Sequence, residues 1–377
     1  MTIFTGPTNT TTMYFILNRE VLLENLQKVL GPTTTKQNFP ILSAVLIAAT
    51  NSGLNFTTTD LDISIIASQK TDVIEQGRIV IPMKRFLSIV RELPPSEVSL
   101  KIVKNNLLIS CEQIEFKINT LNPEEFPKIE EEKKTMLIKI NPKNLEEMLR
   151  LTSFCVGHED TNYVLGGIFF EIFEDKISLV ATDGKRLSFI KKKLPLNQAE
   201  IKTKASFILP IKAINELYKL IKDREEDIFL FIKENKVGFD FKDTQFIARP
   251  IEGDFPNYSQ YIPNINKDKL VINRKKFLFA LKRADLLSTI DYQGVKLELK
   301  KNQMEVSKNT PQLGETKETI NTQYSGPPLE IDFNPQYLID VLKNLEEEEV
   351  GIEFFGADKP AIIRKNDYIY LVLPMKI

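Results

Sequence analysis

Few residues in this chain are suited to nucleophilic or acid–base chemistry. Its 377 residues include one histidine, His158, and two cysteines, Cys111 and Cys155. Any Ser-His or Cys-His mechanism would have to use His158, and three such residues cannot supply the four ligands of a zinc site. His158 stands in a polar loop, Gly157-His158-Glu159-Asp160, without an obvious base partner. We therefore expect a surface or phosphate-contacting histidine rather than a catalytic one.

Paired carboxylates are the other candidates for chemistry, because two of them can hold Mg²⁺. Asp60 and Asp62 lie close together at a strand edge, and Glu124 and Glu125 lie at a join between expected elements. Neither pair has a third ligand nearby, so we interpret both as parts of solvated turns. The chain also lacks a GxxxxGKS/T phosphate loop, a GxSxG elbow and an HExxH motif. The sequence thus predicts no catalytic residue, no metal site and no cofactor.

One hairpin signal displays charged side chains beside an apolar one. Asp183-Gly184 lies between two short apolar runs, which is a strong hairpin pattern. The turn would leave Lys185 and Arg186 next to Leu187 on the surface.

The C-terminal segment 370–377 is apolar to its last residue, and apolar tails usually dock as a final strand. Pro374 ends strand pairing. We therefore expect Met375 and Ile377 to line a surface groove, because methionine suits adaptable binding surfaces.

These segments are positioned by helices that recur three times. A first type follows a short strand ending in Asn18, Asn141 or Asn273. Asparagine is a good N-cap because its side-chain oxygen accepts a hydrogen bond from a free helix N–H, and Pro142 suits a first helical turn. Apolar residues then recur at i, i+4 and i+7, as on one buried face. The three stripes are Leu22, Leu26, Val29; Leu145, Leu149, Thr152; and Phe277, Leu281, Ala284.

A second type of helix opens at Ile81-Pro82, Leu209-Pro210 and Asn334-Pro335. Both types recur at intervals of about 126 residues, which is one third of the chain. The second stripes are Phe86, Ile89, Val90, Leu93; Ile214, Leu217, Tyr218, Ile221; and Leu338, Val341, Leu342, Leu345. The six expected helices are 18–30, 82–92, 142–152, 211–222, 273–286 and 334–343.

The rest of each third consists of short segments of alternating polarity beside turn residues, which predict antiparallel strands. The fold class is therefore α+β, with three tandem similar domains, each of antiparallel sheets covered by two helices. Expected strands include 44–48, 54–58, 63–67, 107–111, 115–119, 168–172, 177–181, 228–232, 237–241, 296–299, 303–307, 352–355 and 368–373.

The expected domains are 13–130, 131–262 and 263–377, and a Phe-Pro pair stands at each join, Phe126-Pro127 and Phe255-Pro256. Residues 1–12 carry no Lys or Arg and do not resemble a secretory signal. We interpret them as a disordered extension, although they could also reflect an alternative start or residues added by cloning. The longest apolar stretch, 39–49, is too short to span a bilayer, and two cysteines fit a reducing compartment such as the cytoplasm.

The charge of the whole chain is nearly balanced, with 50 Lys+Arg against 51 Asp+Glu. On the six expected helices, however, basic residues exceed acidic ones by about eight, and elsewhere acidic residues are in excess by about nine. Lysine and arginine are good helix formers with solvated heads, and this alone could account for the excess. The alternative is a shared basic face that attracts phosphates without base-specific contacts. On that hypothesis the DNA-binding cations are Lys84, Lys143, Arg150, Lys212, Arg274, Lys275 and Lys282.

Nearly the whole chain, from Met13 to Ile377, resembles the bacterial DNA polymerase III β subunit family, the sliding clamps. The motifs are weak singly and very specific in this order. They are Gly31-Pro32, Phe39-Pro40-Ile41-Leu42, Thr59-Asp60-Leu61-Asp62, Asn119-Thr120-Leu121, Phe126-Pro127, Ala181-Thr182-Asp183-Gly184-Lys185-Arg186-Leu187, Phe255-Pro256-Asn257-Tyr258, Tyr324-Ser325-Gly326, Phe333-Asn334, Tyr337, Leu342 and Leu373-Pro374-Met375-Lys376.

The resemblance implies the DNA clamp fold and a head-to-tail homodimer, a ring of six domains with helices lining the hole. Such a ring encircles duplex DNA without sequence specificity and tethers the polymerase III α subunit and other proteins that carry clamp-binding peptides. It is opened by a clamp loader that uses ATP, and is itself a non-catalytic subunit without cofactors. It is cytoplasmic and has no membrane partner.

The resemblance also places a groove for partner peptides, where a short apolar peptide with a Gln and a Leu or Phe would dock. Its residues here are Leu165, Thr182, Gly184, Lys185, Arg186, Leu187 and Pro256, with Asn334, Tyr337, Pro360, Leu371, Leu373, Pro374 and Met375. Departures from the family pattern are Val164 for an aromatic, Lys185 for histidine, and Gln260 and Tyr261 for arginine and a small aliphatic residue.

Further DNA contacts are implied at Lys36, His158 and Tyr163, in a loop that also holds Glu159 and Asn162, where an arginine is expected. The implied dimer interface combines Phe116 and Ile118 with Leu286 and Leu287. Basic residues expected before Phe116 are replaced by Gln113 and Glu115.

Two other hypotheses remain at this point. The chain could be a three-domain scaffold that binds proteins only, and salt-dependent DNA contact would distinguish it. It could also be an enzyme acting on DNA, which would require metal-dependent nuclease activity that is lost on Asp60→Asn or Asp62→Asn.

Overall fold

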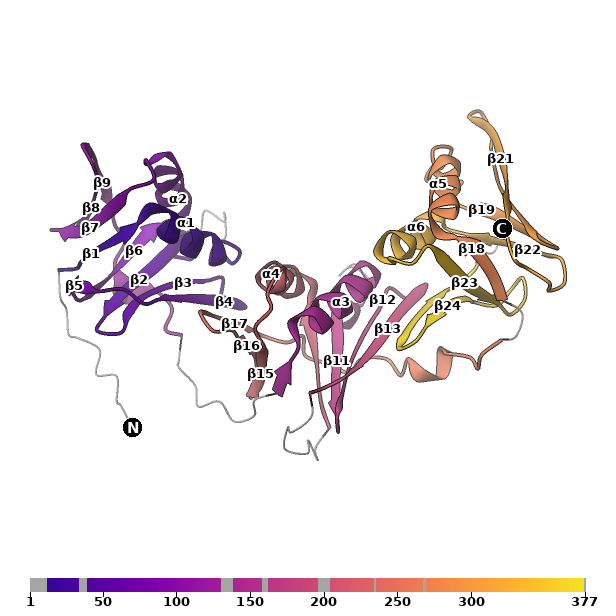
Figure 1. The fold of residues 1–377 in the computed structure, drawn as a ribbon, viewed down its shortest axis with the longest axis horizontal. Coiled ribbons are helices and arrows are strands. Elements are labelled where there is room, and N and C mark those ends of the chain that lie inside the picture. The colour runs from indigo at the N-terminus through magenta and orange to yellow at the C-terminus, as the bar shows by residue number, and fades with distance from the viewer. Residues whose placement is uncertain are drawn as a thin grey trace. The chain divides into compact units, whose positions relative to one another are not determined.

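The computed structural model describes residues 12–33, 39–129, 138–157, 162–195, 204–233, 235–266 and 269–375. The chain divides into two compact units (Figure 1). The first comprises Met1–Pro142 and Asn215–Pro250, and the second comprises Lys143–Ile214 and Ile251–Ile377. In the described residues each unit contains an eight-stranded sheet and a smaller one, and every pairing is antiparallel.

The first unit takes its strands from the first and central thirds of the chain. Its eight-stranded sheet has the order β10 (Ile138–Ile140), β15 (Ile228–Lys233), β16 (Lys236–Asp240), β17 (Thr244–Ala248), β4 (Ile63–Gln69), β3 (Gly53–Thr59), β2 (Ala44–Thr50) and β6 (Gly77–Pro82). Its five-stranded sheet has the order β5 (Val73–Glu75), β1 (Tyr14–Asn18), β7 (Glu97–Val103), β8 (Asn106–Cys111) and β9 (Ile114–Asn119).

The second unit takes its strands from the central and last thirds. Its eight-stranded sheet has the order β14 (Ala205–Pro210), β11 (Gly167–Phe173), β12 (Lys176–Thr182), β13 (Arg186–Lys193), β25 (Tyr368–Val372), β24 (Ala361–Lys365), β23 (Glu349–Phe354) and β18 (Lys269–Asn273). Its four-stranded sheet has the order β21 (Gly314–Asn321), β20 (Gln303–Thr310), β19 (Val295–Lys300) and β22 (Leu329–Phe333).

All six predicted helices are confirmed. Asn18 accepts a hydrogen bond from Glu20 N (2.8 Å), and Asn273 and Asn334 cap their helices in the same way. The asparagines are caps rather than helical residues, so these helices begin one residue later than predicted. The helices are α1 (Arg19–Lys28), α2 (Met83–Glu92), α3 (Pro142–Thr152), α4 (Ile211–Ile221), α5 (Arg274–Asp285) and α6 (Pro335–Asn344).

The predicted apolar stripes form the cores. α1 packs against α2 in the first unit, and α5 against α6 in the second (Figure 1). Every residue of the three first-type stripes is buried, and in the second type only Ile89 and Tyr218 are half-exposed. No helix in the described part of the chain is long and apolar enough to cross a membrane.

Strand pairing continues across the boundaries between the thirds. In the first unit β4, from the first third, pairs with β17, from the central third, so that Ser64 faces Ile247. In the second unit β13 pairs with β25 in the same manner, and Leu187 faces Leu371. Each eight-stranded sheet is therefore two four-stranded sheets joined by backbone hydrogen bonds.

Ion pairs reinforce the join in the first unit. Lys28, at the end of α1, lies 2.7 Å from both Asp243 and Glu24, and Arg224 donates to Asp243 over 2.9 Å. Burial opposes ionisation of Asp243, but the hydrogen bonds and charges of Lys28 and Arg224 outweigh it and lower its pKa to about 2. This carboxylate thus joins a helix of the first third to the β16–β17 turn of the central third.

We expect Asp243→Asn to destabilise the protein at neutral pH by about 1 kcal/mol, since the site is partly solvated and screened. Because the folded pKa is lower than the unfolded one, the contribution is present above about pH 4 and is lost as the pH falls toward 2. Urea denaturation from pH 7 to pH 2 should show the wild-type advantage shrinking with pH. Lys242→Met, on the same turn but paired only with exposed Glu226, is the control and should change little.

Candidate functional site: a peptide groove and its counterpart

The turn Thr182–Arg186, between β12 and β13, is fixed by hydrogen bonds from its own side chains. Thr182 Oγ1 donates to Arg186 O (2.6 Å) and accepts from Gly184 N (3.1 Å). Asp183 Oδ1 accepts from the backbone N–H groups of Lys185 (2.9 Å) and Arg186 (3.0 Å). Gly184 has a φ of +84°, a conformation that glycine adopts without strain. The predicted hairpin is confirmed, with Lys185 exposed beside buried Leu187.

Arg186 is half-buried and bonded to several partners, and is not displayed on the surface as predicted. Its guanidinium donates to Asp183 (2.9 Å), to Asp340 on α6 (2.8 Å) and to Phe154 O (2.7 Å), and it lies 4.5 Å from the ring centroid of Tyr337. Arginine satisfies several partners at once because its donors are planar and fixed. Arg186 therefore fixes the turn of the central third onto the first turns of α6. Asp183 and Asp340 were not among the predicted site residues; only the adjacency of Asp183 to the basic pair signalled one of them.

An apolar floor lies next to this turn, on one face of the eight-stranded sheet. Val180, Leu187, Ile362 and Leu371 are buried together there, from four adjacent strands. Aromatic and aliphatic residues pack against them from the sheet and from the chain after β17. These are Phe169, Phe189, Phe255, Tyr258, Ile262, Phe355 and Ile369.

The chain after β17 is attached firmly to this face. Phe255 stacks on Phe169 with ring centroids 4.9 Å apart and planes 6° apart. The Tyr258 hydroxyl contacts Glu171 Oε2 at 3.4 Å, and burial together with this carboxylate raises the pKa of Tyr258 to about 12. Pro256, a predicted groove residue, is exposed between these two aromatic anchors.

The C-terminal tail continues beyond β25 beside the turn Thr182–Arg186. β25 ends at Val372, and Leu373 N then donates to Lys185 O over 2.9 Å. No strand continues past Pro374 in the described residues, as predicted, and Met375 N makes a single hydrogen bond to Asp332 O over 2.7 Å. Leu373 is exposed and Met375 is half-buried. Ile377 lies outside the described residues.

The remaining predicted groove residues occupy different roles. Asn334 caps α6, and the Tyr370 hydroxyl donates to Tyr337 O over 2.7 Å, which fixes the start of that helix. Leu165 is half-buried and its carbonyl accepts from Gly157 N. Pro360 is half-buried directly before β24. Every predicted groove residue lies in the second unit, and Leu187 and Leu371 are the two that belong to the buried apolar cluster.

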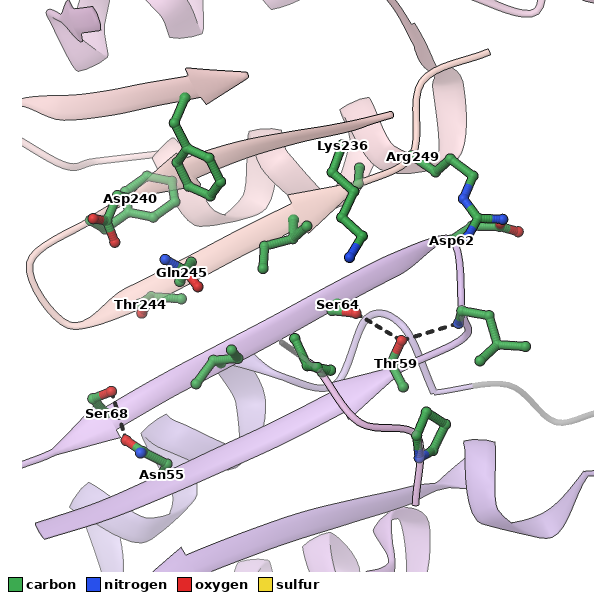
Figure 2. A pocket seen from close by; sticks show the side chains of 18 of the residues that line it. Asn55, Thr59, Asp62, Ser64, Ser68, Lys236, Asp240, Thr244, Gln245 and Arg249 are labelled. Atoms are coloured by element: carbon green, nitrogen blue, oxygen red, sulfur yellow. Dashed lines mark hydrogen bonds between the residues drawn. The ribbon is translucent and has the colours of Figure 1, made fainter. Parts of the chain in front are cut away.

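The first unit has a second groove of about 680 Å³ over β3, β4, β16 and β17. Figure 2 shows hydroxyl and amide side chains of Asn55, Thr59, Ser64 and Ser68 on neighbouring strands. Ser68 Oγ donates to Asn55 Oδ1, and Thr59 shares a hydrogen bond with Ser64, both over 2.8 Å. The groove is lined by these paired polar groups together with apolar side chains such as Phe231, Phe241 and Ile247.

Its turn, Thr59–Ile63, has the same hydrogen bonds as the turn Thr182–Arg186. Thr59 Oγ1 donates to Ile63 O (3.0 Å) and accepts from Leu61 N (3.1 Å). Asp60 Oδ1 accepts from Asp62 N (3.1 Å) and Ile63 N (2.7 Å). Arg249 N donates to Asp62 O over 2.9 Å, as Leu373 N does to Lys185 O. The two grooves are structural repeats, and the predicted interpretation of Asp60 and Asp62 as a solvated turn is confirmed.

The side chains at equivalent positions differ between the two grooves. Ser64 stands in place of Leu187, Asp62 in place of Lys185, and Arg249 in place of Leu373. Of the two equivalent turns, only Thr182–Arg186 is followed by a leucine, and this Leu187 is buried in an apolar cluster with Leu371.

The predicted DNA-binding cations fall into two groups. Arg150 is bonded to Asn344 O and paired with Glu346, and Arg274 donates to Glu347 O (2.7 Å) and Leu342 O (2.8 Å). The others have exposed side chains on helices: Lys84, Lys143, Lys212, Lys275 and Lys282. Tyr163 is exposed as well, whereas Lys36 and His158 lie outside the described residues.

The predicted interface residues lie at the margins of the two smaller sheets. Phe116 is exposed on β9, the edge strand of the five-stranded sheet, and Ile118 is nearly buried there. Leu286 and Leu287 follow α5 directly, and Leu286 is 81% exposed. Phe116 and Ile118 thus lie on a sheet edge, whereas Leu286 and Leu287 lie in the loop between α5 and β19.

The two cysteines are poorly suited to nucleophilic chemistry. Burial raises the pKa of both thiols, that of Cys155 well above its ordinary value, so neither is a thiolate at neutral pH. No cluster of three or more His, Cys, Asp or Glu side chains that could hold a metal occurs in the part of the chain described.

Comparison with known proteins assigns all three thirds to one family. Models of the DNA polymerase III β subunit match residues 13–130 (N-terminal domain), 139–257 (central domain) and 259–376 (C-terminal domain). The β sliding clamp of Bacillus subtilis is 32% identical over 97% of this chain and 100% of its own length.

Solved structures agree with the sequence comparison. A crystal structure of the DNA polymerase sliding clamp from Bacillus subtilis covers 97% of this chain and 99% of its own, with a TM-score of 0.92 and 30% identity. A sliding clamp from Bartonella birtlesii bound to griselimycin also has a TM-score of 0.92, with 29% identity over 97% of this chain and 100% of its own.

Three family models over three tandem α+β domains, with these relatives, identify a sliding clamp, a non-catalytic processivity factor rather than an enzyme. The chain belongs to the DNA polymerase III β subunit family.

The equivalent turns permit a reciprocal test of backbone strain. Leu61 has a φ of +82° where the other turn has Gly184, and it is 59% exposed, so it gains little from packing. We expect Leu61→Gly to raise the free energy of unfolding by about 1 kcal/mol, because the left-handed conformation is costly for a residue with a Cβ. Gly184→Ala should lower it by about 1 kcal/mol, since an added Cβ meets nothing within 4 Å and only the backbone term remains. Urea denaturation measures the free energy of unfolding of both variants. Changes of the same sign would contradict the interpretation that Leu61 and Gly184 occupy equivalent left-handed positions.

Proposed function

We propose that two copies of this chain close head to tail into a ring that encircles duplex DNA without sequence preference and tethers the replicative polymerase. Family membership and the relatives described as DNA polymerase sliding clamps support this function. The proposed domains are 13–130, 131–262 and 263–377, and the proposed location is the cytoplasm.

The observation that carries the head-to-tail arrangement is a pair of unmatched edge strands. β9 occupies the position in the first repeat that β17 and β25 occupy in the later ones, and β21 corresponds to β4 and β13. Inside the chain these strand types pair with each other, as β4 with β17 and β13 with β25. Each chain is left with one unused strand of each type, so β21 of one copy can pair with β9 of the next. Two unlike surfaces make a closed ring when the rotation closes.

Exposure of side chains on β9 fits this arrangement. Ile114 and Phe116 are exposed on β9, whereas the corresponding strands β17 and β25 are mostly buried where they join a neighbouring repeat. Apolar groups on an open sheet edge favour association with another strand. We propose that Phe116 and Ile118 meet Leu286 and Leu287 of a second copy.

The proposed DNA contacts are the exposed helix cations Lys84, Lys143, Lys212, Lys275 and Lys282. Cations on helix surfaces attract phosphates without reading bases, and screening over about 8 Å at physiological salt makes the acidic remainder nearly irrelevant to them. Arg150 and Arg274 would contribute less, because their guanidinium groups already bind backbone carbonyls. Lys36, His158 and Tyr163 remain predictions from the family resemblance.

The second-unit groove is the proposed site for partner peptides from the polymerase III α subunit, the clamp loader and other DNA-processing proteins. Its apolar floor, formed by Leu187 and Leu371 and closed by Met375, suits a leucine or phenylalanine anchor. The first-unit groove has Ser64 where this one has Leu187, so we propose one peptide per chain.

The ring is tested by topology. Light scattering should give about twice the chain mass of 43.3 kDa. Once loaded, the protein should remain on nicked circular DNA and leave after a single cut linearises it, because retention comes from encirclement rather than from tight contacts. Gel filtration of the DNA-bound fraction before and after cutting measures this. Equal retention on both forms would exclude encirclement and favour a protein-binding scaffold that contacts DNA only from outside.

The groove is tested by Leu187→Ala and Met375→Ala. Each removes apolar contact area from the anchor pocket, so we expect the affinity for a fluorescent peptide with a Gln and a Leu or Phe to fall about 10-fold or more. Ile247→Ala, at the position in the first-unit groove that corresponds to Leu371, is the matched control and should leave the affinity unchanged. Thermal unfolding shows whether each variant is folded. Unchanged affinity in both groove variants would remove the assignment.

A further inference from the structure

The segment 286–294, between α5 and β19, displays apolar side chains on a loop. Leu286 is 81% exposed, Ile290 is 90% exposed and Tyr292 is 48% exposed. The segment contains no helix or strand, and its backbone hydrogen bonds are local: residues 286–288 donate to the end of α5, and Thr289 N donates to Tyr292 O. An exposed loop with apolar side chains binds a partner well only if something holds it in place, because ordering it on binding would cost entropy.

Two side chains of β20 hold this loop. Lys308 Nζ donates to Tyr292 O over 2.9 Å and to Gly294 O over 2.7 Å. Thr310 Oγ1 donates to Leu287 O over 2.6 Å. Residues two apart on a strand share a face, so Lys308 and Thr310 attach to the beginning and end of the same loop from one side of the sheet.

Lys308 is unusual for a lysine because its side chain is almost completely buried, with 4% exposure. No carboxylate lies within ion-pair distance of it in the described residues, and its ammonium is bound by the loop carbonyls. Burial lowers the pKa of Lys308, and the charge of Asp285 acts weakly in the opposite direction. A buried ammonium is costly unless it is fully hydrogen-bonded, so an apolar residue would suit this position better if packing were its only role.

The same lysine is adjacent to the unpaired edge strand. Lys308 on β20 pairs directly with Thr316 on β21. One residue therefore sets the position of the apolar loop relative to the strand proposed to meet β9 of a second copy. We propose that Lys308 is a positioning residue for the association of two copies, which it supports by holding loop 286–294 in register with β21. This inference rests on the head-to-tail ring described under the proposed function.

The test measures the dimer dissociation constant by analytical ultracentrifugation. Lys308→Met keeps much of the side-chain volume but cannot donate to the two carbonyls, and we expect it to raise the dissociation constant about 10-fold or more. Lys308→Arg, which retains donors, should restore much of the affinity. Lys301→Met, on the exposed β19–β20 turn of the same hairpin, is the control and should match wild type.

Hydrogen exchange separates loop positioning from general destabilisation. In Lys308→Met, exchange should accelerate in 286–294 and not in the core helix α6. If Lys308→Met does not fold, Thr310→Val tests the same loop through its single bond to Leu287 O and should weaken the dimer by a smaller factor. Wild-type monomers would overturn the ring itself. A wild-type dimer with unchanged affinity in Lys308→Met, or in Thr310→Val where only that variant folds, would overturn this inference alone.

Discussion

Backbone hydrogen bonding between β4 and β17, and between β13 and β25, converts separate repeats into continuous eight-stranded sheets. A four-stranded sheet with a single layer of two helices has a free edge on each side, and free edges attract other strands. Joining one edge to the next repeat covers that free edge and also fixes the position of the following domain against it. The helices, the grooves and the ion pairs around Asp243 and Arg186 are all placed by these two joins.

The two joins also show that the same backbone arrangement can carry side chains of different chemistry. The turns Thr59–Ile63 and Thr182–Arg186 share their hydrogen bonds, so their backbone geometry is set by a threonine and an aspartate and does not depend on the following side chains. Polar Ser64 and Arg249 then stand in one unit at the positions where the other has apolar Leu187 and Leu373. Recognition can change at such a site without loss of the fold.

The helices and much of the groove were predictable from sequence because their signals are local. Asparagine caps and stripes at i, i+4 and i+7 specify a helix within three turns, and Asp183-Gly184 specifies its hairpin. The partners of Arg186 were not predictable, because Asp340 lies 154 residues away and the contact depends on the β13–β25 join. The burial of Lys308 was not predictable from the alternating pattern of its strand either, because it depends on the loop whose carbonyls bind its ammonium.

The two unused strands of each chain differ from one another, and this gives any closed assembly a direction. In a ring built by joining β21 to β9, the two copies are related by rotation about the axis through the hole. Rotation about that axis leaves front and back distinct, so equivalent grooves in both copies open toward the same side. DNA threaded through such a ring would therefore meet all bound partners on one flank only, and the orientation in which the ring is closed would decide which end of the duplex they face.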